Sequence, residues 1–181
     1  MSKDEVSINS LDQRKIGHDL IAIMVLVGMG SFLDGYDLLN IGNALPFLTH
    51  SISVTPLESG LIGTMTYAGG IIGAAIFGAF ADLRGKKGIF MVDLFLFLIG
   101  SLLSAFVYNA LELIILRFFI GVAIGADIVS APILLSDLSP IIGRGLLLGL
   151  SSLLWPIGAL TSVGISYLLV LMHFSPYIIL F

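Results

Sequence analysis

Two aspartates, Asp34 and Asp37, stand inside an apolar run that extends from about Leu20 to Leu48. A run of this length predicts a membrane-spanning helix. At helical spacing the two carboxyl groups share one face, and Asn40 continues that face. A bare carboxylate in hydrocarbon costs on the order of 3 kcal/mol or more. These side chains must therefore face protein or a water-filled cavity, where they can bind protons or a solute. A helix boundary at the membrane interface is the weaker interpretation, because the chain stays apolar after Asp37.

Another long apolar run, over residues 111–138, contains Arg117 and Asp127. Counting ~1.5 Å per residue from the outer end of each helix places Asp127 at about the level of Asp34, near the middle of the membrane. By the same count, the long side chain of Arg117 is able to reach toward Asp37. Ionisable groups inside a membrane usually pair or mark a pathway. Three acids with one base leave excess negative charge, so we expect one acid to be protonated at rest, as proton coupling requires.

Three further side chains are expected to belong to the same polar cavity: Tyr36, Asn40 and Trp155. Trp155 precedes Pro156, and this pair is equally typical of a wall that faces a substrate and of a simple helix kink. Asp93 lies about one turn inside its helix, and we interpret it as an interfacial partner for Arg84 or Arg144 rather than as a substrate contact.

The composition indicates a polytopic membrane protein. Of the 181 residues, 57% are hydrophobic and 11% are charged, and the mean hydropathy is +1.10, whereas a soluble domain carries roughly 25% charged residues. The net charge of −4 and the lack of a basic run argue against a nucleic-acid partner. The chain has no cysteine, and its three histidines stand far apart, so no metal and no cofactor are expected. The expected surroundings are the lipid bilayer, a small solute and protons.

The hydropathy pattern predicts an all-α fold with five membrane helices, at about 18–48, 57–81, 88–107, 111–138 and 146–172. A polar tail over 1–17 precedes them, and an apolar segment from 176 looks like the first turn of a sixth helix. The first helix is long enough to tilt or bend, with Gly28, Gly30 and Gly35 as candidate bend positions. Thr55 and Asn109 are expected to cap helices. Small residues four apart, such as Gly69 and Gly73, predict close helix packing.

Basic residues predict the orientation. They occur in the tail, in the segment around residues 84–87 and at Arg144, and they are absent from the connections around residues 49–56 and 108–110. Because basic residues are enriched on the cytoplasmic side, the amino terminus is expected in the cytoplasm and the chain in the cell membrane.

The segment between the second and third helices carries a recognisable motif of six residues: Gly78, Asp82, Arg84, Gly85, Lys86 and Lys87. The motif resembles the signature G-x-x-x-D-[RK]-x-G-[RK]-[RK] of the major facilitator superfamily, although the base that usually follows the acid is displaced by one position, to Arg84. The resemblance implies a latch of the cytoplasmic gate. A solvated charged turn that only sets the topology is the alternative.

A second motif follows the fourth helix and consists of Asp137, Pro140, Arg144 and Gly145. It resembles the E-x-x-P-x-x-x-R-G pattern of sugar and organic-anion porters, with Asp137 in place of Glu. Together with the D-G-Y-D sequence that begins at Asp34, it is similar to proton symporters for aromatic acids, phosphate and sugars. Asp127 has no tyrosine beside it, unlike the phosphate symporters, which weakens the phosphate interpretation.

The resemblance implies the amino-terminal half of a transporter that moves a small metabolite (an organic acid, a sugar or phosphate) with protons by alternating access. In such folds the substrate binds near the midplane, between two repeats. The alternative is a half-length chain without transport of its own, from a broken or split gene, with a separate carboxy-terminal half as its partner. An enzyme is a distant third interpretation, because the sequence contains no H-E-x-x-H, no G-x-S-x-G and no phosphate-binding loop.

Overall fold

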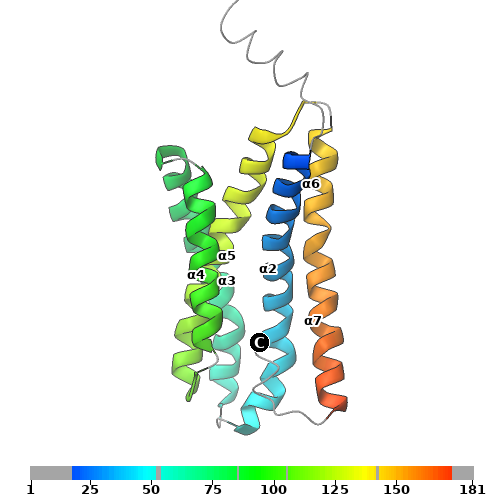
Figure 1. The fold of residues 1–181 in the computed structure, drawn as a ribbon. Coiled ribbons are helices and arrows are strands. Elements are labelled where there is room, and N and C mark those ends of the chain that lie inside the picture. The colour runs from blue at the N-terminus through cyan, green and yellow to red at the C-terminus, as the bar shows by residue number, and fades with distance from the viewer. Residues whose placement is uncertain (1–17, 52–53, 85, 105, 142, 173–181) are drawn as a thin grey trace, which may run out of the picture.

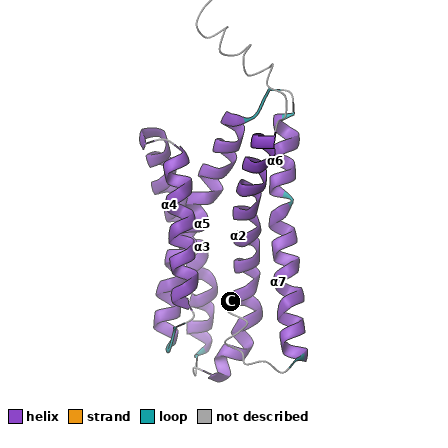
Figure 2. Ribbon diagram, viewed as in Figure 1, coloured by secondary structure: helices purple, strands orange, loops and turns teal. Residues whose placement is uncertain are grey.

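The computed structural model describes residues 18–51, 54–84, 86–104, 106–141 and 143–172. Within these ranges all regular structure is helical (Figure 2). The helices are α2 (His18–Ser51), α3 (Pro56–Arg84), α4 (Lys86–Ser104), α5 (Ala110–Leu138), α6 (Arg144–Ser152) and α7 (Leu154–Leu171). The expected tail over 1–17 and the expected sixth helix from 176 lie outside the described residues.

The helices run along one common direction, with α5 between two groups (Figure 1). On one side α5 packs against α3 and α4, and on the other side α2 packs mainly against α7 and more lightly against α5 and α6. The polar residues of α2 therefore lie where the two groups meet, facing α5. This arrangement positions the candidate site.

Four segments are long and apolar enough to cross a membrane: Leu20–Leu48, Pro56–Ala81, Ala110–Leu138 and Arg144–Leu171. The helix over Gly88–Ser104 is apolar but shorter. We had expected it to continue to residue 107, but the helix ends at Ser104, whose Oγ donates a hydrogen bond to the carbonyl of Gly100 at 2.9 Å. The prediction of a multi-pass membrane protein is confirmed for the described residues.

Both expected helix caps are present. Glu58 N donates to Thr55 Oγ1 at 3.3 Å, and Thr55 N donates to Glu58 Oε2 at 2.8 Å, which makes a reciprocal capping box at the start of α3. Asn109 Oδ1 accepts from Glu112 N at 2.9 Å at the start of α5. Local sequence therefore determines where these two helices begin.

The helix expected over 146–172 is divided into α6 and α7 at Leu153. Pro156 explains the break, because its ring clashes with the carbonyl four residues earlier, at Ser152, and it has no N–H to donate. Leu153 keeps helical backbone angles (φ −66°, ψ −20°), and its N–H donates to the carbonyl of Gly149, four residues earlier, at 3.1 Å. Both interpretations of Trp155 and Pro156, a wall that faces a substrate and a helix kink, therefore stay predictions.

Glycines allow α3 and α5 to approach backbone to backbone. A Cβ atom at Gly73 would overlap the carbonyl oxygen of Val122, and one at Gly121 would overlap that of Thr66. Small residues four apart produce this kind of contact in membranes. The predicted packing role of the glycine rows is confirmed.

The glycines of α2 have the same use. The helix is continuous through Gly28, Gly30 and Gly35, so none of these candidate bend positions interrupts it. A Cβ atom at Gly35 would overlap the carbonyl oxygen of Trp155 on α7. Gly35, which lies between Asp34 and Asp37 in the sequence, therefore lets α7 pack directly against α2.

Candidate functional site

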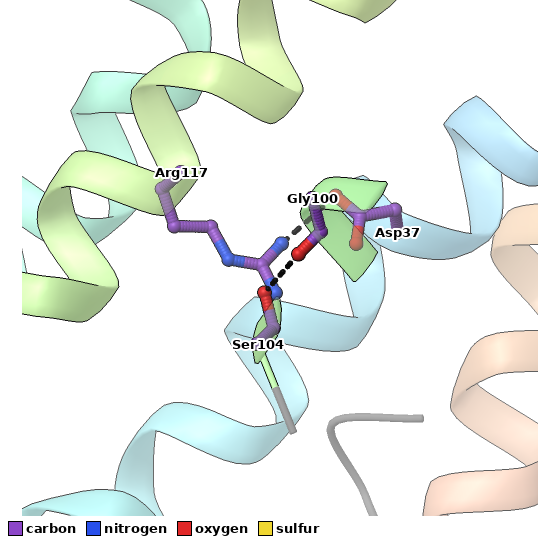
Figure 3. A network of polar contacts seen from close by, with 4 residues as sticks. All are labelled: Asp37, Gly100, Ser104 and Arg117. Atoms are coloured by element: carbon purple, nitrogen blue, oxygen red, sulfur yellow. Dashed lines mark hydrogen bonds and ion pairs between the residues drawn. The ribbon is translucent and has the colours of Figure 1, made fainter. Parts of the chain in front are cut away.

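A buried ion pair connects α2 to α5. Arg117 Nη1 lies 2.8 Å from Asp37 Oδ2, and the two side chains are 1% and 10% exposed (Figure 3). The expectation that Arg117 reaches Asp37 is confirmed. Arg117 Nε is buried without a hydrogen-bond partner among the described residues, so the guanidinium depends on Asp37 for compensation of its charge.

The second pair of the site joins Asp34 of α2 to Asp127 of α5. Both residues are buried, and their carboxyl groups are close enough to interact through a side-chain hydrogen bond. Gly30 makes room for this approach, because a Cβ atom there would lie 3.1 Å from Asp127 Oδ1. Since an ionised carboxylate only accepts hydrogen bonds, two carboxyl groups share one only when a proton is present. The arrangement is therefore suited to binding a proton.

The pair opens onto a cleft of about 350 Å³ between α2, α5 and the α6–α7 break. The cleft is lined by Asp34 and Asp127 together with Ser31, Ser152, Trp155 and Pro156, among others. Trp155 thus lies in the wall of this cleft, two residues after the helix is interrupted at Leu153, with 40% of its surface exposed.

Tyr36 and Asn40 are not among the described residues that line this cleft. Tyr36 is half-buried and stacks on Phe32, with ring centroids 6.5 Å apart. Asn40 is 2% exposed, and its Oδ1 has no hydrogen-bond partner among the described residues. The structure therefore keeps Asn40 on the polar face of α2, whereas it gives Tyr36 an aromatic neighbour.

The interpretation of Asp93 as an interfacial partner of an arginine is wrong. Asp93 is 1% exposed, and its Oδ2 accepts a hydrogen bond from Ser130 Oγ at 3.0 Å. It lines a small inner cavity together with Asp34 and Asp127. Counting depth along the helix did not reveal this position, because burial depends on which side of α4 faces α5. The available signal was that Ser130 follows Asp127 by three residues and so shares its helix face.

The motif after α5 shapes the turn into α6. Ser139 is the C-cap of α5, and its carbonyl accepts a hydrogen bond from Arg144 Nη2 at 3.3 Å. Pro140 is buried, whereas Asp137 and Gly145 are exposed. Arg144 therefore ties the first residue of α6 to the end of α5, and any gating role of this motif remains a prediction.

The segment with the gate motif is more helical than expected. Gly78 lies within α3, which continues through Asp82 to Arg84, and α4 begins at Lys86. Lys87 follows in the first turn of α4, and Gly85 lies outside the described residues. The charged loop expected over 82–87 is thus replaced by helix on either side of residue 85, because Leu, Arg and Lys are good helix formers.

Comparison with known proteins identifies the fold. The chain superimposes on the inward-open conformation of the xylose transporter XylE from E. coli with a TM-score of 0.75 and 21% sequence identity, over 83% of this chain and 40% of XylE. This likeness supports the expectation that these helices belong to a major-facilitator fold.

Curated relatives agree in sequence. The chain is 34% identical over 145 residues to the glucose transporter GlcP of Staphylococcus epidermidis, covering 80% of this chain and 32% of GlcP. It is 31% identical over 166 residues to myo-inositol transporter 2 of Cryptococcus neoformans, covering 90% of this chain and 30% of that protein. The chain thus spans about a third of the length of these relatives. The family model described as "Sugar (and other) transporter" matches residues 23–181. The chain therefore belongs to the sugar (and other) transporter family of the major facilitator superfamily, a family of transporters and not of enzymes.

Proposed function

We propose that the chain is the amino-terminal bundle of a transporter that moves a small metabolite together with protons by alternating access. The observation that carries this proposal is the buried ion pair between Asp37 and Arg117, which joins the two helices that also carry the carboxyl pair. Burying several ionisable groups inside a membrane protein costs free energy, and such groups usually mark a pathway for protons or solute.

The charges suggest how a proton is coupled to movement. A proton that binds Asp37 neutralises the partner of Arg117 and weakens the ion pair between α2 and α5. Because Arg117 is buried, its uncompensated charge then favours a state in which water or solute reaches it. Asp34 and Asp127 supply a proton-binding position directly on the cleft of about 350 Å³ between α2, α5 and the α6–α7 interruption, which we call the transport cleft. Protonation at these positions therefore biases the bundle between two arrangements.

The substrate class follows from the cleft and the relatives. Ser31 and Ser152 supply hydroxyl groups, and Trp155 supplies an aromatic surface, which suits the polar and apolar faces of a sugar. The relatives named above are named for glucose and myo-inositol. A sugar or another polyol is thus the first candidate, followed by an organic acid, with phosphate third.

The proposal includes a location and a partner. The chain lies in the cell membrane with its amino terminus in the cytoplasm, because the sequence has basic residues around positions 84–87 and at Arg144 but none in the connections around 49–56 and 108–110. Alternating access requires a second bundle that rocks against the first around a shared site. That bundle is a carboxy-terminal half, in the same or a separate polypeptide, and Asp82 latches the cytoplasmic gate against it.

Uptake in proteoliposomes tests the coupling. The chain is reconstituted with its carboxy-terminal half, and uptake of glucose, myo-inositol, benzoate and phosphate is measured with and without an imposed proton gradient. Asp34→Asn or Asp127→Asn is expected to abolish accumulation against a gradient while exchange of solute persists. If both variants still accumulate solute with the same pH dependence as the unmodified protein, the coupling role is rejected.

The same experiment separates the alternative of a half-length chain without transport of its own. The 181-residue chain alone is expected to show no saturable uptake, because alternating access requires a second bundle around the shared site. Saturable uptake by the chain alone that is lost in Asp37→Asn would contradict the need for a second bundle.

A further inference from the structure

Asp93 is a buried carboxyl group that the ion pair and the carboxyl pair do not use. One of its oxygens, Oδ2, accepts from Ser130 Oγ at 3.0 Å. The other, Oδ1, is buried with no hydrogen-bond partner among the described residues. Because an unpartnered carboxyl oxygen is costly to bury, this atom needs a proton or a water molecule that the surrounding side chains do not supply.

Asp93 shares a cavity with the pair formed by Asp34 and Asp127. All three residues line the inner cavity between α2, α4 and α5, whose volume of about 10 Å³ is enough for one water molecule. Asp34 and Asp127 also line the transport cleft, whereas Asp93 is not among its lining residues. The carboxyl pair therefore stands between the cleft and Asp93.

The charges around the inner cavity are almost all negative. Asp93 interacts electrostatically with Asp127, and Asp34 interacts with both and also with Asp37, its neighbour on α2. The cation of α5 is Arg117, which Asp37 already engages and which is not among the residues that line the inner cavity. Neither α3 nor α7 contributes a residue to the inner cavity. Within the part of the chain that the structure describes, no group of three or more His, Cys, Asp or Glu is arranged to hold a metal ion. Protons are then the available compensation for the clustered carboxyl groups.

Building on the proposed proton coupling, we infer that Asp93 is a third proton-binding group, positioned by Ser130 and connected through one water molecule to Asp34 and Asp127, so that the three carboxyl groups bind and release protons as one cluster.

The chemistry is a proton transfer and needs no other reactant. The O–H bond of a protonated Asp93 breaks as the bridging water accepts its proton, and the water passes another proton to the carboxylate of Asp127. Asp93 ends as the carboxylate and Asp127 as the acid, and the water is regenerated. Asp93 thus supplies a proton to the pair at the cleft from a position that the solute does not reach.

Infrared spectroscopy of the purified 181-residue chain in lipid nanodiscs tests the cluster without any transport. The C=O band of protonated carboxyl groups is followed between about pH 5 and about pH 9. Asp93→Asn is expected to remove one band and to shift the pH midpoint of the bands that remain, because interacting groups titrate as a unit. If the remaining bands keep their midpoint, Asp93 does not belong to the cluster and the inference is wrong.

Three further variants make the test specific. Ser130→Ala is expected to shift the frequency of the Asp93 band without removing it, because one hydrogen bond to Oδ2 is lost, and it remains informative if Asp93→Asn does not fold. Asp93→Glu is expected to restore the midpoint at least in part. Glu112→Gln is the matched control, since this exposed side chain on α5 keeps an acceptor for Tyr108 N and leaves the bands of the cluster unchanged. A midpoint that changes when sodium replaces potassium would show a bound cation in place of protons and would overturn the inference.

The outcome is separable from that of the proposed function. If the chain transports nothing but its carboxyl bands titrate as a unit, the proposed function is rejected and the proton-binding cluster is supported. Conversely, uptake by the reconstituted transporter can depend on Asp34 and Asp127 and yet be insensitive to Asp93→Asn. If the number of protons per solute and the pH profile are unchanged in that variant, the proposed function is supported and the role of Asp93 in the cluster is rejected.

Discussion

Asp34 and Asp37 lie three residues apart on α2, and each interacts with a different residue of α5. Asp37 accepts from Arg117 at 2.8 Å, whereas Asp34 interacts with Asp127. One position therefore neutralises a buried cation, and the other lies beside a second buried carboxyl group. The D-G-Y-D sequence thus carries two carboxyl groups with different electrostatic surroundings, and the glycine between them admits the backbone of α7.

The ion pair predicts non-additive stability. Asp37→Asn and Arg117→Gln are each expected to destabilise the bundle by about 3–5 kcal/mol, because each leaves a buried group without its partner. The double variant is expected to lose less than the sum of the two. Thermal unfolding in detergent, followed by circular dichroism, measures all three, with the exposed Glu112→Gln as control. Strictly additive losses would show that the pair contributes no coupling energy.

The glycine contacts predict a difference between two alanine substitutions on α3. Gly73→Ala is expected to cost about 1–3 kcal/mol, because its Cβ would overlap the backbone of Val122 and force the helices apart. Gly60→Ala is the matched control, since a Cβ there meets nothing within 4 Å, and its higher helix propensity is expected to leave stability equal or slightly raised. Equal effects on the unfolding temperature would refute the close-packing argument.

The cap of α5 predicts a local effect. Asn109→Ala is expected to cost about 1 kcal/mol, because Glu112 N loses its acceptor at the start of the helix. Asn109→Asp keeps an oxygen at the same position and should retain the cap. Hydrogen exchange of the Glu112 amide measures the change, and exchange that is equally slow in Asn109→Ala would mean that the side-chain cap is dispensable.

The gate motif predicts a shift between transport states. In the protein reconstituted with its carboxy-terminal half, Asp82→Asn is expected to favour the inward-open state, because the cytoplasmic latch loses its charge. The chain has no cysteine, so a single cysteine introduced by Ser152→Cys in the transport cleft reports access from each side. Faster labelling from the cytoplasmic side is expected, and unchanged labelling from both sides would argue against a gating role.

Much of this architecture follows from the local sequence and from the depth of each residue along its membrane-spanning helix. The apolar runs predicted a multi-pass helical protein, and Thr55 and Asn109 marked two helix starts because capping depends on residues within one turn. The burial of Asp34, Asp37 and Asn40 was predictable, since hydrocarbon does not tolerate exposed carboxyl groups. The pairing of Arg117 with Asp37 was within reach of a count of helical rise, because both helices cross the same slab.

The tertiary structure decided what depends on rotation about the helix axes and on contacts between helices. Asp93 is the clearest case. The sequence indicated its depth along the helix, but its contact with Ser130 depends on the side of α4 that packs against α5. Gly30 and Gly35 suggested bends in the sequence, and only the neighbouring α5 and α7 show that they make room for Asp127 and Trp155.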